Sequence, residues 1–315
     1  MKAFVTGPCG FIGSHLVDQL IDNGHEVVGM DNMATGFHQF VNPRMKLVTG
    51  DLRDAGSVVS AMEGCNSVFH LSANADISKG WDDPTRDFKQ NVLSTSNVLE
   101  AMRELGITKI MLASSSAVYG ESSVVPTPEN CPWPIQTSLY GASKVAGEAL
   151  VQAYCEGKNF EGYIFRFCPV VGERYTHGHI FDFVKRLLAD PSRLEVKGDG
   201  GQQKSYVYVA DVVEGILRTM EIGATYNAVE IYNVGNPEVT SIKQSIRYIC
   251  EEMGLTPQVH FLGGDRGWTG DMPMLFPSSA KLLQTGWATG TDTETGIRKT
   301  VRWLLNNRWA LEERK

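Results

Sequence analysis

The first twenty residues carry the pattern that most limits what this chain can fold into. Residues 2–6 are a short apolar run, and three spaced glycines follow in Gly7-Pro8-Cys9-Gly10-Phe11-Ile12-Gly13. An amphipathic stretch then runs from Phe11 to about Ile21. A strand, a tight glycine turn and a helix in this order let the backbone approach a pyrophosphate, and the helix amino terminus offers unpaired amides to that anion. The pattern therefore predicts the first unit of a parallel sheet that binds a dinucleotide.

A second apolar strand, residues 26–30, ends at Asp31. A carboxylate about 20 residues after such glycines can accept hydrogen bonds from both ribose hydroxyls of an adenosine, and it repels a 2′-phosphate. The sequence therefore favours NAD over NADP.

Apolar runs of strand length alternate with longer helical patterns over the first half of the chain. Strands are expected near residues 2–6, 26–30, 46–49, 67–71, 108–113 and 161–167, and helices are expected to begin near Phe11, Ser57, Asp87 and Leu139. This alternation predicts an α/β fold, a Rossmann-type doubly wound parallel sheet covered on both faces. We place this NAD-binding domain at residues 1–167.

The alternation weakens after residue 167 into shorter elements. Strands are expected near 194–196 and 206–209, and helices near Ile180, Ala210, Ser241, Ser278 and Thr293. We assign residues 168–315 to a smaller α/β substrate lobe. The loop 121–138, with Pro126, Pro128, Pro132 and Pro134, is too rich in proline for a helix or a central strand, and we expect it to form a wall over the site.

Tyr140 and Lys144 stand four residues apart in a predicted helix, so they project from one face and can act on one atom. An unperturbed Tyr titrates near ~10, so a base that works near neutral pH needs a shift of about 3 units, or roughly 4 kcal/mol. A nearby ammonium supplies part of that stabilisation of the phenolate. The pair predicts a general base.

Further motifs extend from one end of the chain to the other. They are Gly50-Asp51-Leu52, Val68-Phe69-His70-Leu71-Ser72-Ala73, Asn91-Val92-Leu93, Ser114-Ser115-Ser116-Ala117-Val118-Tyr119-Gly120, Gly198-Asp199-Gly200, Tyr206-Val207-Tyr208-Val209 followed by Asp211, and residues 266–273. With the spaced glycines and the Tyr-x-x-x-Lys pair, they make the chain resemble the extended short-chain dehydrogenase/reductases. Within these it resembles the nucleotide-sugar epimerases and dehydratases, and most of all the UDP-glucose (UDP-galactose) 4-epimerases.

The resemblance implies roles for particular residues. The catalytic set is Ser115, Tyr140 and Lys144, where Lys144 also binds the nicotinamide ribose. The implied NAD contacts are Gly7, Gly10, Phe11, Ile12, Gly13, Asp31, Asn32, Asp51, Leu52, Leu71, Ser72, Ala73, Asn91, Ser114, Tyr140 and Lys144. The implied substrate contacts are Ser115, Ser116, Lys204 and Arg266 toward the sugar and phosphates, and Asp271 toward a ribose. Part of the second lobe is expected to fold back onto the first domain.

The residues after Ser115 narrow the reaction. Dehydratases of this family carry an Asp and a Glu there, and the decarboxylases usually carry the Glu, whereas this chain has Ser116 and Ala117. Neither side chain is a general acid at neutral pH. What remains is oxidation and re-reduction of one carbon, which is 4-epimerisation. The resemblance implies a UDP-hexose as the substrate. A 4-keto-sugar reductase, a 4-epimerase of a UDP-uronic acid and a non-catalytic dinucleotide sensor stay open as alternatives.

Two positions depart from the pattern of related sequences, and one short segment with two histidines needs an interpretation. Pro169 stands where relatives commonly have an Asn that contacts the diphosphate, and Lys204 stands where Arg is more usual. Thr176-His177-Gly178-His179 offers no recognisable third ligand, so we interpret it as a loop and helix cap and expect no metal.

Composition bears on partners and location. The net charge of −7 makes nucleic acid an unexpected partner, and no apolar run approaches the ~20 residues of a membrane span. Six cysteines without a Cys-x-x-Cys motif are read as reduced thiols, and Met1 leads almost directly into the first strand, so we expect a cytoplasmic protein without a membrane segment. By resemblance, the helices that begin near Asp87 and Leu139 form a homodimer interface.

Overall fold

The computed structural model describes residues 1–74, 80–132, 135–223, 229–268 and 270–314, so Pro134 and Thr269, which lie in two of the segments above, are outside the described residues. The chain forms two compact units. The first comprises Met1–Val118, Ser138–Arg166 and Val213–Tyr232. The second comprises Tyr119–Thr137, Phe167–Val212 and Asn233–Lys315.

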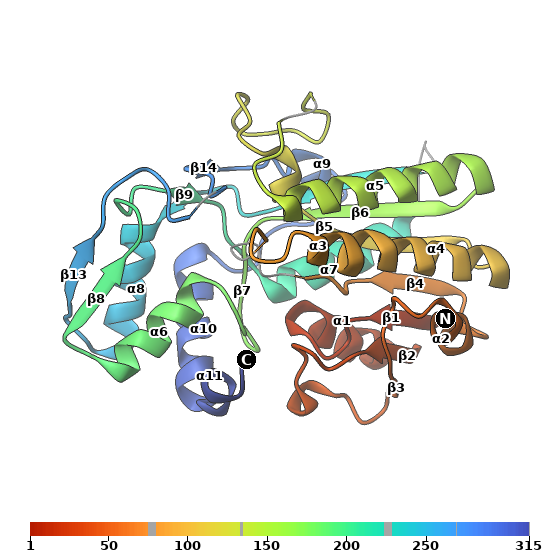
Figure 1. Ribbon diagram of the computed structural model, residues 1–315, viewed down its shortest axis with the longest axis horizontal. Coiled ribbons are helices and arrows are strands. Elements are labelled where there is room, and N and C mark those ends of the chain that lie inside the picture. The colour runs from red at the N-terminus through yellow and green to blue at the C-terminus, as the bar shows by residue number, and fades with distance from the viewer. Residues whose placement is uncertain (75–79, 133–134, 224–228, 269, 315) are drawn as a thin grey trace. The chain divides into compact units, whose positions relative to one another are not determined.

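The first unit is built on a sheet that has seven strands among the described residues, in the order β11-β6-β5-β4-β1-β2-β3 (Figure 1). The pairs β1–β2, β2–β3, β1–β4 and β4–β5 are parallel. The strands are β1 (Lys2–Thr6), β2 (Glu26–Asp31), β3 (Lys46–Thr49), β4 (Ser67–His70), β5 (Lys109–Ser115), β6 (Glu161–Phe167) and β11 (Val229–Val234). The predicted fold class is confirmed. The sequence pattern missed β11, which comes late in the chain and lies at one end of the strand order.

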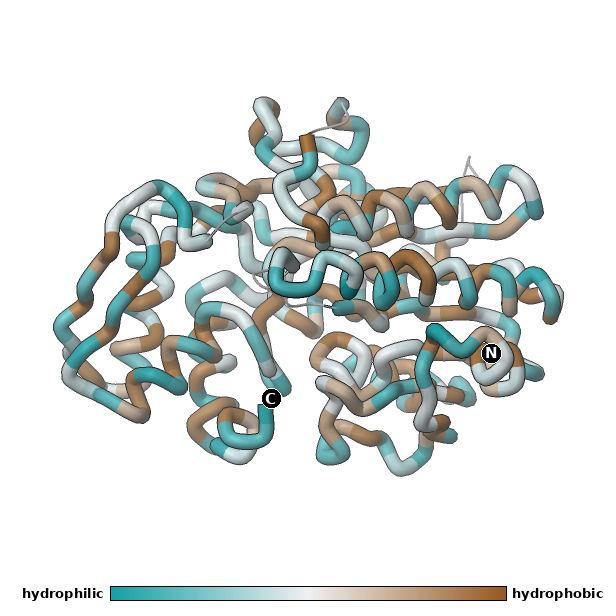
Figure 2. Tube along the Cα trace, viewed as in Figure 1, coloured by the Kyte–Doolittle hydropathy of each residue, from teal (hydrophilic) through white to brown (hydrophobic). Residues whose placement is uncertain are grey.

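Helices connect and cover these strands. They are α1 (Phe11–Asp22), η1 (His38–Phe40), α2 (Ala55–Met62), α3 (Thr85–Asp87), η3 (Phe88–Leu93), α4 (Ser94–Leu105), η4 (Ser116–Tyr119), α5 (Leu139–Lys158) and α7 (Val209–Ile222). Helix α4 packs against α2 and α5, and brown and teal alternate along α4 and α5 in Figure 2, as expected for helices with one buried face. Their apolar side chains share one core cluster with β1, β2, β4, β5 and β6.

The helix expected to begin near Asp87 contains a π-helical turn. α3, η3 and α4 follow one another without a break, and η3 is π-helical over Phe88–Leu93. Single π turns inside α-helices occur frequently at functional sites. This one carries Asn91, which the sequence assigned to the cofactor.

The second unit is assembled from short strands and amphipathic helices. The elements are β7 (Val170–Val171), α6 (His179–Ala189), β8 (Arg193–Val196), β9 (Gln203–Lys204), β10 (Val207–Tyr208), β12 (Thr240–Ser241), α8 (Ile242–Met253), β13 (Gln258–Phe261), β14 (Met274–Leu275), α9 (Ala280–Leu283), α10 (Thr293–Asn306) and α11 (Trp309–Glu313). The strands pair as β10–β7, β12–β9–β14 and β13–β8.

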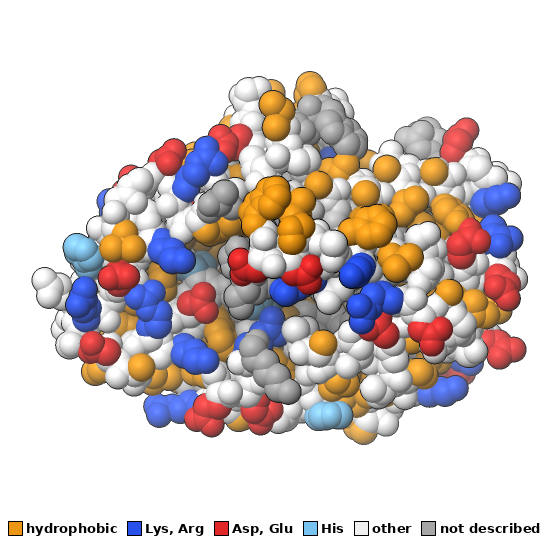
Figure 3. Space-filling view, viewed as in Figure 1, with side chains coloured by type: hydrophobic (Ala, Val, Ile, Leu, Met, Phe, Trp, Pro, Cys, Tyr) orange, Lys and Arg blue, Asp and Glu red, His pale blue; other side chains and the backbone are white. Residues whose placement is uncertain are grey.

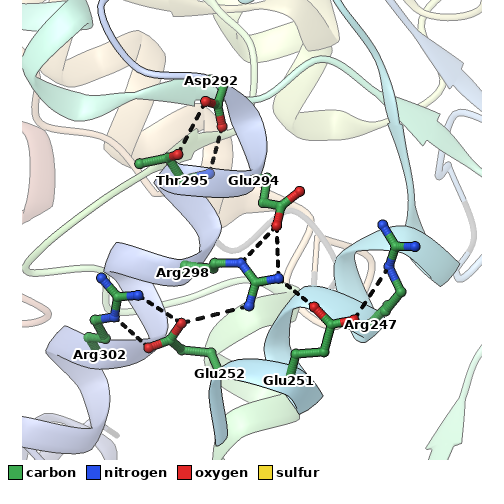
Figure 4. Close-up of polar contacts among 8 residues, drawn as sticks. All are labelled: Arg247, Glu251, Glu252, Asp292, Glu294, Thr295, Arg298 and Arg302. Atoms are coloured by element: carbon green, nitrogen blue, oxygen red, sulfur yellow. Dashed lines mark hydrogen bonds and ion pairs between the residues drawn. The ribbon is translucent and has the colours of Figure 1, made fainter.

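Ion pairs join α8 to α10 in this unit (Figure 4). Arg298 on α10 contacts Glu294 on its own helix at 2.8 Å and Glu252 on α8 at 3.7 Å, and it also pairs with Glu251. Arg302 pairs with Glu252 as well. Because the Arg298 side chain is only 21% exposed, this guanidinium joins the two helices at a partly buried position.

No helix within the described part of the chain is both long and apolar enough to cross a membrane.

Candidate active site

The glycine turn between β1 and α1 is tightly packed. Gly7 has φ +68°, which favours glycine, and a side chain on Gly13 would place its Cβ 2.1 Å from the Gly7 carbonyl oxygen. Gly10 is the N-cap of α1 and provides no side-chain cap, and the first turn of that helix holds no acidic residue. The turn therefore brings bare backbone and a helix amino terminus to one place, which suits a phosphate group.

Asp31 ends β2 beside this turn. Its Oδ2 accepts a hydrogen bond from the Cys9 amide at 3.1 Å, and its Oδ1 accepts one from the Met33 amide at 2.9 Å. Burial raises the pKa of this carboxyl, and the two amide hydrogen bonds oppose that rise. The two amides fix the carboxylate in orientation, and each oxygen retains a lone pair for a ribose hydroxyl.

Ser115 and Tyr140 meet in the first unit. Ser115 ends β5 and Tyr140 lies in the first turn of α5, which Ser138 caps by accepting a hydrogen bond from the Gly141 amide at 3.0 Å. A hydrogen bond joins the Ser115 and Tyr140 side chains and lowers the pKa of the phenol. The predicted hydroxyl pair is therefore assembled by the strand end and the helix start.

Lys144 lies one turn further along α5 and is buried, at 7% exposure. Its Nζ donates a hydrogen bond to the Ala113 carbonyl at 2.8 Å and lies 5.7 Å from the centre of the Tyr140 ring. Burial lowers the pKa of Lys144 to about 8, while Glu148 and then Asp87 raise it. The ammonium is thus held on β5, next to the strand end that carries the serines.

The direction of the Tyr140 shift differs from the sequence expectation. Burial raises the pKa of Tyr140 to about 12, because desolvation disfavours the phenolate more than the Ser115 hydrogen bond favours it. The four-residue spacing correctly predicted that Lys144 lies near Tyr140, but it did not predict how far burial raises the pKa of Tyr140. The lowering that a base needs must come from charge that arrives at the site.

Asn91 and its neighbours form a buried polar network around the start of α5. The Asn91 side chain donates to Ser143 Oγ at 2.7 Å and accepts from the Asn74 amide at 2.7 Å. Ser143 Oγ donates in turn to the Tyr140 carbonyl at 2.7 Å. Asn74 also donates to Asp87 at 2.8 Å. The π turn is thereby bonded to the backbone of the proposed base.

His70, which the sequence analysis quoted within a motif without assigning it a role, links the glycine turn to α4. Thr6 Oγ1 accepts hydrogen bonds from the Leu71 and Ser72 amides, so its proton goes to His70 Nδ1 at 2.8 Å. Nε2 of His70 then donates to Thr95 Oγ1 at 2.9 Å. Burial, followed by the charge of Lys144, lowers the pKa of His70 to about 3, so the ring is a neutral structural link.

The other predicted cofactor residues lie at or just after strand ends, or in the first turn of α1. Asp51 pairs with Arg53 at 2.6 Å, and Asn32 Oδ1 accepts a hydrogen bond from the Ala34 amide at 3.0 Å. The Ser114 hydroxyl is used inside the protein, since it donates to Glu148 at 2.5 Å. Phe11 and Leu52 are buried, whereas Ile12, Leu71, Ser72 and Ala73 are half-buried. Ser116, proposed for the substrate, is buried in η4.

Lys204, Arg266 and Asp271 come together in the second unit. Lys204 Nζ donates to Asp271 Oδ1 at 2.6 Å, and Arg266 Nη1 donates to the Asp271 carbonyl at 3.1 Å. Arg266 also pairs with Glu121, which the sequence reading did not single out. The three residues that were placed together by resemblance therefore form one cluster of charges.

Pro169 and His179, which the sequence analysis singled out, make ordinary structural contacts. Pro169 precedes β7, and its carbonyl accepts a hydrogen bond from the Val207 amide at 3.0 Å. His179 opens α6, and its ring nitrogen bonds to Ser245 Oγ at 2.7 Å. In the described part of the chain, no group of three or more His, Cys, Asp or Glu residues is placed to hold a metal ion.

Comparison with known proteins adds to this geometry. Residues 3–235 match the model of the NAD dependent epimerase/dehydratase family. The chain belongs to this family. Among curated proteins it is 34% identical over 310 residues to a putative UDP-glucose 4-epimerase of Methanocaldococcus jannaschii, covering 96% of this chain and 98% of that protein.

Solved structures of similar proteins agree. A crystal structure of a UDP-galactose 4-epimerase superposes with a TM-score of 0.90 at 35% identity, covering 98% of this chain and 100% of the other. The UDP-glucose 4-epimerase of Thermus thermophilus, in complex with NAD, superposes with a TM-score of 0.86 at 31% identity, covering 97% and 99%. The predicted family is thereby confirmed.

The residues present fit the NAD that this family uses. The uncapped start of α1 suits a pyrophosphate, and the absence of a Cβ at Gly13 keeps that turn in place. Asp31 suits the adenosine ribose, and its charge opposes a 2′-phosphate.

Proposed function

We propose that this chain is an NAD-dependent epimerase that inverts C4 of a UDP-hexose of the glucose and galactose type through a transient 4-keto sugar. The assignment depends most on one observation: Ser115 is hydrogen-bonded to Tyr140, and the two residues that follow it, Ser116 and Ala117, carry no acid. This arrangement can exchange a proton at one hydroxyl, but those two positions supply no general acid for loss of water.

Tyr140 is the proposed base. Its deprotonated oxygen takes the proton of the C4 hydroxyl, directly or through Ser115, and returns it after the sugar has turned over. NAD, held by the glycine turn, Asp31 and Lys144, would supply reversible hydride chemistry at C4. Lys144 orients the nicotinamide ribose and adds positive charge beside Tyr140, which favours the phenolate.

Inversion requires a firmly held nucleotide and a loosely held hexose. We assign Lys204 and Arg266 to the diphosphate and Asp271 to the uridine ribose. A lysine offers a point charge in place of the bidentate fork of an arginine. Pro169 adds no donor, because its ring removes the backbone N–H.

The test is to incubate the protein with UDP-glucose, UDP-galactose and their uronic and N-acetyl relatives, following C4 configuration by proton NMR and absorbance at 340 nm. Inversion without added NAD and without net absorbance change supports the proposal and names the sugar. Stoichiometric consumption of NADH or NADPH with a keto sugar would point to a reductase. Binding without any turnover would point to a sensor.

Tyr140→Phe isolates the base. The variant should keep bound NAD and lose at least about 10²-fold in turnover, which is the usual contribution of a general base. Tyr163→Phe is the matched control, because Tyr163 is another buried tyrosine of the first unit and its hydroxyl donates to Glu161 rather than to a residue of the site. A near-normal rate for Tyr140→Phe would remove Tyr140 from the role of base.

We also propose a homodimer formed through α4 and α5. Phe88 and Leu93 are 59% and 37% exposed just before α4, and α5 exposes Ala142, Ala149 and Ala153. Orange side chains gather over α5 and the start of α4 in Figure 3. Exposed apolar surface of this kind is typical of protein contacts. Sedimentation should show a dimer that Phe88→Glu weakens, whereas a monomer at micromolar concentration would refute the interface.

A cytoplasmic location is proposed as well. All six cysteines are free thiols, and thiols persist in reducing compartments.

A further inference from the structure

Glu148 is a buried carboxylate that the proposed reaction does not use. It lies on α5 one turn after Lys144 and is 4% exposed. Arg166 on β6 holds it through Nε, which donates to Oε1 at 2.9 Å and to Oε2 at 3.2 Å, and through Nη2, which donates to Oε2 at 2.7 Å. Ser114 on β5 donates to Oε1 at 2.5 Å. A carboxylate bound so completely has one orientation.

The same strand holds Lys144. The ammonium donates to the carbonyl of Ala113, and the hydroxyl of the next residue, Ser114, holds Glu148. Two successive residues of β5 therefore fix two side chains that stand four apart on α5. Residues four apart on a helix are neighbours on its surface. Any displacement of Glu148 moves the surroundings of Lys144.

A buried ammonium is stable only with compensating negative charge. The hydrogen bond that Lys144 donates to Ala113 goes to a neutral carbonyl. The charged or titratable groups that the described residues place against it are Glu148 on α5, Asp87 on α3, the neutral His70 on β4 and Tyr140 itself. Arg166 on β6 acts on it through its ion pair with Glu148. Burial lowers the pKa of Lys144 to about 8, and Glu148 is the first of the two carboxylates that oppose this fall.

We propose that Glu148, oriented by Arg166 and Ser114, is a positioning residue that keeps Lys144 charged and seated on the Ala113 carbonyl. The inference rests on the proposed function of Lys144. Arg166 has the opposite effect on the charge of Lys144, because it neutralises most of the charge of Glu148. The ion pair therefore stabilises the ammonium less than an isolated carboxylate would.

Two substitutions that break the same ion pair distinguish positioning from mere support. Glu148→Gln keeps the shape and the acceptor for Ser114 but removes the negative charge that Arg166 and Lys144 face. Arg166→Met removes the cation that pairs with Glu148 and leaves the carboxylate with Ser114 and Lys144. Both variants should lose stability, because each removes one partner of a buried ion pair. The pKa of Lys144 should nevertheless move in opposite directions in the two variants. It should fall in Glu148→Gln by about one unit or more, because a unit charge one helical turn away is lost, and it should rise in Arg166→Met, because the charge of Glu148 is no longer neutralised.

The pKa is read directly from the ¹³Cε resonance of Lys144 in lysine-labelled protein, assigned by its loss in Lys144→Met. In turnover, the basic limb of the pH profile of kcat should move with it, toward lower pH in Glu148→Gln and higher pH in Arg166→Met. Glu148→Asp, which keeps the charge, should retain most of the wild-type profile. Glu100→Gln, which removes an exposed carboxylate from α4, should leave the Lys144 resonance unchanged.

Shifts in the same direction, or no shift in folded variants, would overturn the proposal. The NMR titration needs no turnover, so it separates the two levels of inference. If the resonance moves as expected while the kcat profile stays fixed, Glu148 sets the charge of Lys144 as proposed and the role of Lys144 in the reaction is what fails.

Discussion

Gly13→Ala tests whether the glycine turn is shaped by close packing. A Cβ on residue 13 would lie 2.1 Å from the Gly7 carbonyl oxygen and 2.9 Å from its carbon. Both are backbone atoms, so no side chain can move aside, and α1 must shift away from the turn. Overpacking of this kind costs about 1–3 kcal/mol and a severe backbone clash lies at the upper end. The better helix propensity of Ala returns about 1 kcal/mol.

The net expectation is a loss of roughly 2 kcal/mol in the free energy of unfolding, or a fall in Tm of about 3 °C for a chain of 315 residues. NAD binding should fall by more than stability does, since the displaced helix start is the proposed pyrophosphate site. Thermal denaturation by circular dichroism and titration with NAD by calorimetry measure the two effects separately.

Two glycines supply graded controls. At Gly10 the added Cβ would lie 3.3 Å from the Gly7 oxygen, which a small adjustment can relieve. At Gly157, inside α5, it would meet nothing within 4 Å, so Gly157→Ala should stabilise the protein by about 0.5–1 kcal/mol. If Gly13→Ala proves as stable and binds NAD as tightly as Gly157→Ala, close packing does not shape the turn.

Three further results are expected. Asp31→Ala should weaken NAD binding at least about tenfold and NADP binding far less. Two hydrogen bonds to a charged acceptor are lost only for the free ribose of NAD. Calorimetry that shows an equal loss of affinity for both cofactors would exclude ribose recognition by Asp31. Arg298→Met should lower the free energy of unfolding in urea by about 1–2 kcal/mol, and the loss should shrink in about 1 M salt. Arg193→Met is the control, because Arg193 forms an exposed ion pair of 3.8 Å, and it should lower that free energy by under about 0.5 kcal/mol. Burial lowers the pKa values of His70 and His179 to about 3, below the ~6.5 of the unfolded chain. Between these two pKa values the unfolded state binds more protons than the folded state. The free energy of unfolding should therefore fall with decreasing pH, by up to about 1.4 kcal/mol per pH unit for each ring. Urea titrations from pH 7 to 5 measure that slope, and a flat profile would contradict the burial of the two neutral rings.

The sequence predicts the first unit well because its signals are local. Six strands and the helices between them follow from apolar period and from glycine turns, and each predicted range lies within a few residues of the observed one. The fold class and the family follow from the same features. β11 escaped because nothing local links residues 229–234 to a sheet whose other strands end at residue 167.

Predicted site residues divide according to how far apart their partners lie. Tyr140 and Lys144 share a helix, so spacing alone places them on one face. Ser115 joins Tyr140 because Ser115 ends β5 and Tyr140 lies in the first turn of α5, the next long helix after that strand end. The Arg166 contact to Glu148 crosses from β6 to α5, and no periodicity signals it, although the four-residue step from Lys144 to Glu148 is visible in the sequence.

The pKa values of the site residues are the property that sequence spacing predicts least. The pattern correctly places an ammonium near the phenol, yet burial raises the pKa of Tyr140 to about 12 and lowers that of Lys144 to about 8. Desolvation penalises both charged forms at once, and its size depends on packing from several elements that a motif does not contain. The protein's own carboxylates, Glu148 and Asp87, support the cation of Lys144, while Asp87 opposes the phenolate of Tyr140. The resting site is therefore set to hold a charged lysine beside a protonated tyrosine, and the positive charge of oxidised NAD is the group suited to shift the tyrosine toward its active form.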